Sequence, residues 1–556
     1  MTKMSDVKEN NFPFKELIPA LVLSFVTCFM LWIFDPTIIY AANMNDFWFD
    51  YGMLMKTMFI YFLVAFLGLS FLFGIVYFIN KKFFKEKKIF KIFYIVSLII
   101  FIATYIQGNY LVGDLPVLTG DEIEWGNYLV NDIITVFIWI ALIVSSVILC
   151  KKYKIEEVIK TSVYVVGAIF LMLLTSMLPS LFTENMFLKK DFIEITTENL
   201  NVASTDKNYY IFLVDSVDSQ MFNDVLQKSN YSDTLNDFTY YPDTLAGYPY
   251  TRDSIPLILT GKWNKNEKSF IDYYKESMNN SELFNELDKQ GYIINIYEDE
   301  NLSLLDNNDF ISNIKTSHSV EKLFILAKQE TKYIAFRYLP YFLKKYTHVY
   351  FSNHIETNDD NLFYWSDKFY YDFIDKYGFE TTDEKMFHFL HLEGAHQPFL
   401  YDEDLNEVSY EEGSYEKKVG ATIKTINKFI TELKESGQYD NSIIIVMADH
   451  GYSTQENMTT IDRMNPILYI KRINEKHDKI IISDKQISFN DIFDGLMDLL
   501  NDKEPFQDIT NHEKRIFIES IYNSDATMFE WVTEDKAWEI SKMKRTGNKF
   551  KKLKGR

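Results

Sequence analysis

The stretch Ser442-Ile-Ile-Ile-Val-Met-Ala-Asp-His-Gly451 decides the fold class of the second half of this chain. An unbroken apolar run ends in an acid, an imidazole and a glycine, which is typical of a buried parallel strand with polar side chains at its carboxyl end. The stretch Tyr209-Tyr-Ile-Phe-Leu-Val-Asp-Ser216 repeats the pattern and ends in Asp215. A third apolar run carries His391 and is followed by His396. These runs predict strands whose polar ends converge at one sheet edge.

Short apolar runs alternate with amphipathic segments from about residue 205 onward. The other candidate strands are Tyr292–Tyr297, Met386–Leu392, Ile467–Ile470 and Ile516–Ile521. One helix is predicted between Ser414, an N-cap, and Gly437, and a shorter one from Ser281 to Gln290. The alternation predicts an α/β domain with a doubly wound, mostly parallel sheet, in which ligands bind beyond the carboxyl ends of the strands.

Five long apolar stretches lie ahead of residue 190. They are Leu17–Phe34, Thr57–Ile79, Ile89–Ile106, Ile133–Cys150 and Ser162–Phe182. A membrane span needs roughly 20 mostly apolar residues, and such runs in succession are rare in soluble folds. The sequence therefore predicts an α-helical membrane domain of five transmembrane helices. The predicted boundaries are 1–183 for this domain, 184–204 for a connecting segment, 205–540 for the α/β domain and 541–556 for a basic tail.

The charges of the loops predict the orientation in the membrane. Basic residues gather at Lys3, Lys8 and Lys15, in 81–88 and in 151–154, whereas the first and third loops carry only acids. Because positively charged loops stay in the cytoplasm, the N-terminus is expected inside. Five crossings then place everything after Phe182 outside. The expected location is the cell membrane, multi-pass, with an extracytoplasmic α/β domain.

Composition excludes several classes of function. The formal net charge of −21 argues against a nucleic-acid partner. Only two cysteines occur, Cys28 and Cys150, and both lie in apolar runs, so no disulfide framework is expected. There is no P-loop, because Gly261-Lys262 is followed by Trp263. The absence of a P-loop agrees with a domain outside the cell, where free ATP is scarce.

The C-terminal end departs from the acidic balance of the chain. Its basic residues are Lys542, Lys544, Arg545, Lys549, Lys551, Lys552, Lys554 and Arg556, with no acid among residues 541–556. Such a tail can lie on anionic lipid head groups, with about 1 kcal/mol for each basic residue near the surface. It can equally be disordered and contact wall polymers. The sequence leaves both alternatives open.

The strand ends bring together residue types that suit a metal. Asp215, Asp449 and His450 each follow an apolar strand, and carboxylates with imidazoles are ligands for divalent ions such as zinc or manganese. Taken alone, an acid at a strand end is more often a helix cap, and His391 is equally well a core histidine. The combination favours a metal site because each group follows an independent strand.

A hydroxyl nucleophile is predicted in the segment Thr244–Gly261, which combines glycine, proline and hydroxyls ahead of an apolar helix. Thr251 and Ser254 are the candidates. The simpler interpretation makes Thr251 an N-cap with Ser254 in the first turn, and it is compatible with a nucleophile, because the free N–H groups of a helix N-terminus suit a phosphate and a metal would activate the hydroxyl. Arg463 is a candidate phosphate contact, although a solvated surface arginine is the simpler interpretation.

These segments, in this order, resemble the alkaline phosphatase/sulfatase superfamily. The five spans make the chain similar to its membrane branch, the lipoteichoic acid synthases and phosphoethanolamine transferases. The resemblance implies one or more divalent metal ions, manganese, zinc or magnesium. It implies metal ligands at Asp215, Thr251, Asp449 and His450, with Thr251 as the nucleophile, and substrate contacts at His396 and His391.

The chain also departs from its relatives in this superfamily. Hydrolytic sulfatases need Cys/Ser-x-Pro-x-Arg, and Ser254-Ile-Pro-Leu-Ile258 lacks the arginine, which disfavours a true sulfatase. Asp215 stands where the lipoteichoic acid synthases have Glu. The Phe-Trp-Asn-Arg segment of glycerol-phosphate polymerases is not evident, and Glu298-Asp299-Glu300 is acidic, which weakens the case for a glycerol phosphate donor. The cysteines of Gram-negative phosphoethanolamine transferases are missing, which fits a Gram-positive type of cell.

The resemblance implies a phosphotransferase of the cell surface. It would take a phospho-head group, glycerol phosphate or phosphoethanolamine, from a membrane phospholipid donor. A phospho-threonine at Thr251 would pass the group to a surface glycan, a teichoic acid or a lipid-linked sugar. The alternative is a membrane-anchored phosphodiesterase, phosphatase or sulfuric ester hydrolase of the same superfamily. A non-catalytic protein that binds a polymer or partner is the third hypothesis, and the oligomeric state stays open.

Overall fold

A computed structural model describes residues 14–551 except for 45–46, 48, 84–87, 113–122, 124, 184–185, 190–192, 299–301, 303–304, 306–308, 317–319, 348, 350–360, 453–459 and 521–526. The chain divides into two compact units. A helical unit comprises Met1–Leu118, Ile123–Lys189 and Ser319–Asn353, and an α/β unit comprises the rest. Several charges that predict the orientation, including Lys3, Lys8, Asp46 and Asp114, lie outside the described residues.

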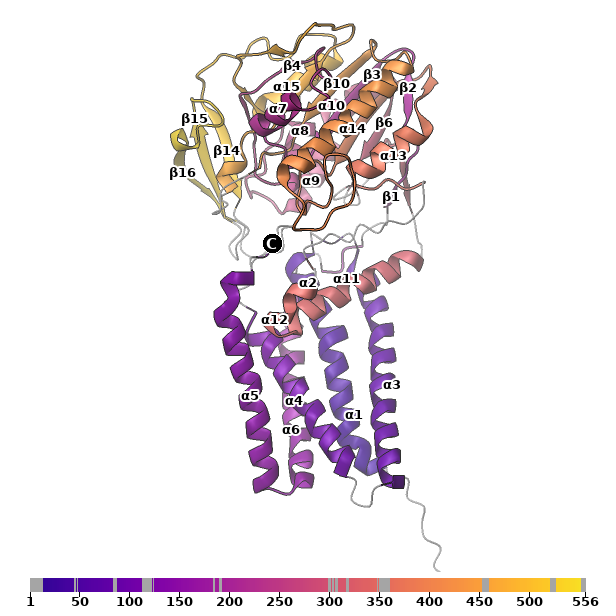
Figure 1. The fold of residues 1–556 in the computed structure, drawn as a ribbon, viewed down its shortest axis with the longest axis vertical. Helices are drawn as coiled ribbons and strands as arrows, with labels where there is room; N and C mark the ends of the chain where they lie inside the picture. Colours follow the sequence, from indigo (N-terminus) through magenta and orange to yellow (C-terminus); the bar gives the residue numbers. More distant parts are fainter. Residues whose placement is uncertain are drawn as a thin grey trace, which may run out of the picture. The chain divides into compact units, whose positions relative to one another are not determined.

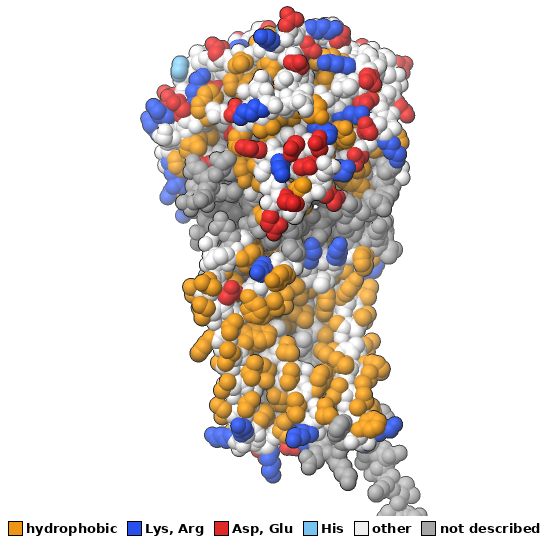
Figure 2. Space-filling model, in the orientation of Figure 1, with side chains coloured by type: hydrophobic (Ala, Val, Ile, Leu, Met, Phe, Trp, Pro, Cys, Tyr) orange, Lys and Arg blue, Asp and Glu red, His pale blue; other side chains and the backbone are white. Residues whose placement is uncertain are grey.

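The helical unit confirms the five apolar helices. The segments Glu16–Asn43, Tyr51–Phe83, Lys88–Tyr110, Trp125–Lys152 and Ile155–Phe182 are each long and apolar enough to cross a membrane. Their helices are α1 (Phe14–Phe29) with α2 (Asp35–Asn43), α3 (Tyr51–Phe83), α4 (Lys88–Tyr110), α5 (Leu129–Lys152) and α6 (Ile155–Met177), shown in Figure 1. Large apolar side chains such as Phe71, Phe137 and Tyr164 are exposed on these helices. Figure 2 shows the apolar surface that a bilayer would cover.

The first span is interrupted beside a buried acid. Met30–Phe34 form a π-helical turn, and Asp35 and Pro36 follow. Proline lacks an N–H and its ring crowds the preceding turn, so the backbone shifts to a wider helix there. Asp35 is fully buried and pairs with Arg337 at 2.8 Å.

Arg337 lies in α11 (Val320–Tyr338), which is followed by α12 (Tyr341–Lys344). Helix α11 packs against α2, α3 and α4, and its residues Ile334 and Tyr338 belong to the apolar core of the spans. This segment therefore groups with the helical unit, in contrast to the continuous α/β domain expected over 205–540. Its apolar partners are distant in sequence, so no local pattern points to them.

The α/β unit contains a seven-stranded sheet in the order β12-β4-β11-β10-β3-β9-β6. The strands are β12 (Ile481–Ile482), β4 (Thr239–Tyr240), β11 (Leu468–Lys471), β10 (Ser442–Met447), β3 (Asn208–Val214), β9 (Lys385–Leu392) and β6 (Tyr292–Tyr297). Strands β10, β3, β9 and β6 run parallel, and β11 is antiparallel to both of its neighbours. The predicted mostly parallel sheet is confirmed.

Helices cover both faces of this sheet, as a doubly wound fold requires (Figure 1). They are α7 (Ser219–Lys228), α8 (Thr251–Thr260), α9 (Phe270–Asn279), α10 (Glu282–Lys289), α13 (Asp367–Tyr377), α14 (Tyr415–Glu435) and α15 (Phe489–Leu500). On β3 the side chains alternate between the faces. The hydroxyl of Tyr209 donates to the carbonyl of Leu496 in α15, whereas Phe212 lies 4.3 Å from Phe429 in α14, centroid to centroid.

A smaller antiparallel sheet lies at the end of the chain. It consists of β14 (Arg515–Ser520), β15 (Met528–Thr533) and β16 (Lys544–Phe550). The strand predicted near Ile516 therefore exists but lies outside the main sheet. Part of the segment expected as a basic tail is strand β16, because its backbone pairs with β15. Three two-stranded sheets complete the unit: β1 (Ile193–Ile195) with β7 (Ile314–Thr316), β2 (Val202–Ser204) with β8 (Glu380–Thr382), and β5 (Thr244–Leu245) with β13 (Ile487–Ser488).

Candidate metal and phosphoryl-transfer site

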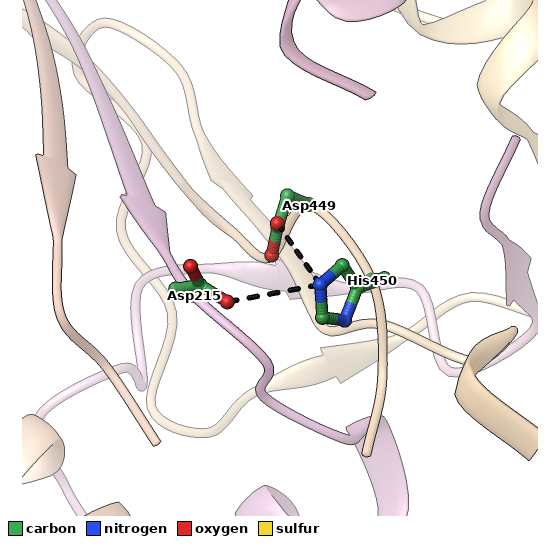
Figure 3. Close-up of side chains that lie close together, drawn as sticks. All are labelled: Asp215, Asp449 and His450. Carbon is green, nitrogen blue, oxygen red and sulfur yellow. Dashed lines mark ion pairs between the residues drawn. The ribbon is translucent and has the colours of Figure 1, made fainter. Parts of the chain in front are cut away.

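Two acids and one histidine meet at the carboxyl ends of β3 and β10. Asp215 follows β3, and Asp449 and His450 follow β10. The two strands are neighbours in parallel register, so their ends coincide. The Nε2 atom of His450 lies 3.3 Å from Asp449 Oδ2 and 3.8 Å from Asp215 Oδ1, as Figure 3 shows. All three side chains are at most 2% exposed.

This group fits a divalent cation. One ligand atom from each of the three residues lies within 4.8 Å of the others. Asp449 Oδ1 accepts from the backbone N–H of Ser216 at 3.1 Å, but Asp449 Oδ2 is buried and has no hydrogen-bond partner among the described residues. An unpaired buried carboxylate oxygen is costly, and a cation would satisfy it. Two carboxylates and an imidazole suit zinc, manganese or magnesium.

The backbone orients the imidazole for such a role. His450 Nδ1 lies 2.8 Å from the carbonyl oxygen of Gly451, to which it donates when it carries the proton. In that tautomer the lone pair of Nε2 faces the two carboxylates. Metal-binding histidines in proteins are commonly fixed in this way by a second hydrogen bond.

Thr251 is the hydroxyl that the structure brings to this group. It begins α8, is half-buried, and donates to Asp215 Oδ2 at 3.2 Å. The N-cap residue of α8 is Tyr250, and its side chain makes no hydrogen bond to the first N–H groups of the helix. The other candidate, Ser254, is buried with its hydroxyl 3.5 Å from the carbonyl of Tyr248. Ser254 therefore does not reach the metal-binding group.

Both predicted histidines of the third strand end also lie at the site. His391 is buried at the end of β9, with Nε2 3.6 Å from Asp215 Oδ2. On its other side, Nδ1 lies 4.0 Å from Glu298 Oε1, so its ring lies between two carboxylates. The indole nitrogen of Trp365 lies 3.3 Å from His391 Nε2, and its ring lies 5.4 Å from that of His396. His396 is half-buried.

The charges of the site affect one another strongly. Burial alone would raise the pKa of Asp215, but the charges of His396, His450 and His391 hold it well below its usual range. Burial lowers the pKa of His391, yet its contact with Asp215 and the charges of Asp215, Glu298 and Asp449 raise it to about 9. The site therefore holds Asp215 as a carboxylate, the form that binds a cation.

Two residues of the site were not singled out by the sequence analysis as functional. Glu298 directly follows the predicted strand Tyr292–Tyr297, so the strand-end pattern that found Asp215 would also have found it. Trp365 lies in an irregular segment, and no sequence signal marks it.

Arg463 is half-buried, with its guanidinium 5.6 Å from the ring centroid of Tyr250, the residue before Thr251.

A family model for sulfatases matches residues 207–502, which is more than half of the chain. The chain belongs to the sulfatase family. This family and the related alkaline phosphatases are enzymes that transfer or hydrolyse phosphoryl and sulfuryl groups with metal ions. The predicted superfamily is thereby confirmed.

Solved structures of this superfamily are similar to the chain at low identity. A protein in the alkaline phosphatase superfamily from Vibrio parahaemolyticus is 15% identical, with 64% of this chain and 85% of that chain covered and a TM-score of 0.39. The phosphonate monoester hydrolase SpPMH from Silicibacter pomeroyi is 12% identical, with 61% and 88% covered and a TM-score of 0.33. The lipoteichoic acid synthase LtaP from Listeria monocytogenes is 12% identical, with 61% and 84% covered and a TM-score of 0.33. No curated protein matches.

Proposed function

We propose that this sulfatase-family protein is a membrane phosphotransferase that moves the phospho-head group of a phospholipid to a surface acceptor through a phospho-threonine at Thr251. The hydrogen bond from Thr251 to Asp215 Oδ2, at 3.2 Å, carries the proposal. It joins an activatable hydroxyl to the carboxylate of a metal-binding group. A structural N-cap would instead direct its oxygen to the N–H groups of its own helix.

A divalent cation bound by Asp215, Asp449 and His450 would lower the pKa of the Thr251 hydroxyl and offset negative charge on the phosphate. Thr251 loses its hydroxyl proton to solvent, its Oγ1 attacks the phosphorus of the lipid, and the bond from phosphorus to the diacylglycerol oxygen breaks. The first N–H groups of α8 bind the phosphate oxygens.

His396 handles the proton in both halves of the reaction. It gives a proton to the leaving diacylglycerol oxygen, and it takes one back from the acceptor hydroxyl that attacks the phospho-threonine. Half-buried beside Trp365, it is less enclosed than the buried His391. In the second attack the bond from phosphorus to Thr251 Oγ1 breaks, Oγ1 regains a proton from solvent, and the head group is joined to the acceptor.

The helical unit supports a lipid donor. Five apolar helices hold the enzyme in the bilayer to which the donor is confined, which replaces a search through solution. We place the N-terminus in the cytoplasm and the α/β unit outside, where a lipid is an available phosphoryl donor. The head group is glycerol phosphate or phosphoethanolamine, the metal manganese, zinc or magnesium, and the acceptor a surface glycan, teichoic acid or lipid-linked sugar.

Intact mass spectrometry tests the proposal. The full-length protein would be incubated with manganese and either phosphatidylglycerol or phosphatidylethanolamine, beside Thr251→Ala and the control Ser254→Ala. We expect a mass adduct on the wild type and on Ser254→Ala but none on Thr251→Ala, and its mass names the head group. Lipid turnover by Thr251→Ala at the wild-type rate would overturn the proposal. Product analysis with and without a glycan acceptor separates transfer from hydrolysis by water.

A further inference from the structure

Ser216 connects the two carboxylates of the metal-binding group formed by Asp215, Asp449 and His450. Its hydroxyl donates to Oδ1 of the preceding Asp215 at 2.7 Å. Its backbone N–H donates to Asp449 Oδ1 at 3.1 Å, so one residue directs a donor at each carboxylate. The other oxygen of Asp215, Oδ2, accepts from Thr251. Because the two acids follow different strands, Ser216 fixes the ends of β3 and β10 relative to each other.

The backbone of Ser216 has a conformation that residues with a side chain rarely adopt. Its φ is 59°, in the left-handed region that glycine favours. Ser216 is only 5% exposed, so this is not a free surface turn. With a negative φ, its N–H and its side chain would point in other directions. Such strained residues persist where surrounding contacts hold them, and they are common at functional sites.

The hydroxyl of Tyr415 holds this conformation. Tyr415 is the first residue of α14 and is buried. Its hydroxyl donates to the carbonyl of Ser216 at 2.9 Å and accepts from the backbone N–H of Asp218 at 2.8 Å. A rotation of the backbone at Ser216 would break the first of these bonds inside the protein, where an unpaired polar group is costly. Tyr415 therefore stabilises the turn that aims the two donors of Ser216.

The ring of Tyr415 reaches the other loops of the site. It stacks on Tyr452, with the ring centroids 4.0 Å apart and the planes at 12°. Tyr452 is the second residue after His450, and its hydroxyl accepts from Gln397 at 3.0 Å. Gln397 directly follows His396. One tyrosine thus contacts the turn after β3 and, through its stacking partner, the segments that carry His450 and His396.

We propose that Ser216 and Tyr415 are positioning residues that hold the carboxylates of the metal-binding group ready for a cation. Ser216 fixes the Asp215 carboxylate relative to Asp449, and Tyr415 maintains the left-handed turn on which this depends. Residues that support metal ligands in this way set the affinity for the ion. The inference rests on the metal dependence of the proposed function. It adds two residues that act through the ligands and not on the substrate.

Substitutions of Ser216 separate positioning from a merely structural role. Ser216→Gly removes the hydroxyl together with the backbone strain, and Ser216→Ala removes the hydroxyl alone. Ser216→Thr keeps the hydroxyl but adds a branch that the left-handed region tolerates poorly. All three keep the N–H that donates to Asp449. A merely structural residue would make metal affinity follow stability, whereas a positioning hydroxyl makes metal affinity follow the hydroxyl.

Calorimetric titration of the full-length protein in detergent with manganese tests the inference, paired with thermal unfolding of the metal-free protein. The three Ser216 variants are compared with Tyr415→Phe, which removes the hydroxyl and keeps the ring that stacks on Tyr452. The controls are Ser281→Ala and Tyr209→Phe. Each control removes a buried hydroxyl that donates to a backbone carbonyl outside the metal-binding group, at 2.8 and 2.9 Å respectively.

We expect Ser216→Gly, Ser216→Ala and Tyr415→Phe to bind manganese about tenfold more weakly than the wild type. Ser216→Thr and both controls should bind it nearly as tightly as the wild type. Without metal, Ser216→Gly should melt above Ser216→Ala, and Ser216→Thr below the wild type. Wild-type affinity in Ser216→Gly and Ser216→Ala overturns the inference, as does wild-type affinity in Tyr415→Phe. Affinities that follow the melting temperatures, or a wild type that binds no manganese, overturn it as well.

The Thr251 adduct, measured on the same wild-type protein, keeps this test separate from that of the proposed function. An adduct on the wild type together with unchanged manganese affinity in the Ser216 variants leaves the proposed function standing and removes the inference. Manganese binding that depends on Ser216 and Tyr415, without any adduct, supports the inference and removes the proposed function.

Discussion

Gly394 lies directly against Asp215. A Cβ atom on Gly394 would fall 2.5 Å from both the backbone nitrogen and the backbone oxygen of Asp215. The backbone of Asp215 also donates to Leu392 and accepts from Ala395, at 3.1 and 2.9 Å. The turn that leads to His396 is therefore fixed to the strand end that carries the predicted metal ligand.

Gly394→Ala is expected to disturb this arrangement. Its φ of 58° is in the left-handed region, which costs a residue with a Cβ about 1–2 kcal/mol, and the clash with Asp215 adds to that cost. Gly437→Ala is the control, because Gly437 has a φ of 77° but nothing within 4 Å of its Cβ position. Thermal unfolding and manganese titration should show a larger loss of stability and weaker metal binding for Gly394→Ala alone. Equal losses in both variants would remove any special role of the contact.

Asp449→Asn tests the metal site itself. The Oδ2 atom of Asp449 is the buried oxygen without a hydrogen-bond partner, and the amide replaces a charged ligand by a neutral one. Substitution of a residue that only supports a metal ligand costs about 10–100-fold in metal affinity. Loss of a charged ligand itself should therefore weaken metal binding by at least about 100-fold. Calorimetric titration with manganese and zinc measures the loss, with the exposed Asp494→Asn as control. Unchanged affinity would contradict the assigned ligand.

Asp367 gives the α/β unit a pH-dependent stability. Burial, joined by the charge of Glu393, raises its pKa from 3.8 to about 7, although Lys418, Thr422 and Gly394 act against the rise. Because this pKa is raised, the folded state keeps the proton between about pH 4 and 7 while the unfolded state releases it. The contribution of Asp367 to stability is complete below pH 4 and falls by about 1.4 kcal/mol per pH unit up to pH 7.

Asp367→Asn removes this titration. The melting temperature of the variant relative to the wild type is therefore expected to increase from pH 4 to pH 7 and to level off above it. Scanning fluorimetry of the full-length protein in detergent, at a series of pH values, provides the measurement. If the difference in melting temperature between Asp367→Asn and the wild type stays constant with pH, Asp367 is ionised in the folded protein.

The ion pair of Asp35 and Arg337 attaches α11 within the helical unit. Asp35 is fully buried, and Arg337 also donates through Nε to the carbonyl of Gly108 at 2.8 Å. Arg337→Ala would leave a buried carboxylate without its counter-charge, at a cost of about 3–5 kcal/mol. We expect Asp35→Asn/Arg337→Met to recover most of this stability, because it removes both charges. Thermal unfolding of the two variants in detergent compares them, and equal destabilisation would contradict the pairing argument.

The orientation in the membrane is open to direct labelling. Both natural cysteines, Cys28 and Cys150, would be replaced by serine, and single cysteines placed at the exposed positions Lys152 and Lys479. A membrane-impermeant maleimide added to intact cells should label Lys479→Cys and not Lys152→Cys. Labelling of Lys152→Cys alone would invert the proposed topology.

Much of the fold can be read from the sequence because buried parallel strands are continuous apolar runs. Strand β6 has the predicted bounds Tyr292–Tyr297, and β3 and β10 lie in the apolar runs that precede Asp215 and Asp449. The strand-end pattern also selects Asp215, Asp449 and His450, which the structure brings together with Thr251. Their roles in catalysis stay predictions until tested.

Features that depend on distant partners were not predictable. Helix α11 groups with the helical unit because of Asp35 and the apolar core of the spans, which lie far away in sequence. Trp365 lies in an irregular segment in which Phe363 packs on Tyr297, and no periodic pattern in the sequence marks either contact. The basic residues of β16 read as a tail because glycine, asparagine and lysine are unusual in strands, and only pairing with β15 orders them.

The membership of residues 319–353 in the helical unit bears on how the α/β unit could be separated by a protease. The chain leaves the helical unit after Lys189, returns to it at Ser319 and leaves again at Asn353. A protease that cuts once, within 184–204, would therefore leave the α/β unit attached through α11 and its buried ion pair. Separation of the α/β unit requires further cuts on both sides of that helix, so a single cut would yield a nicked protein whose two units stay joined.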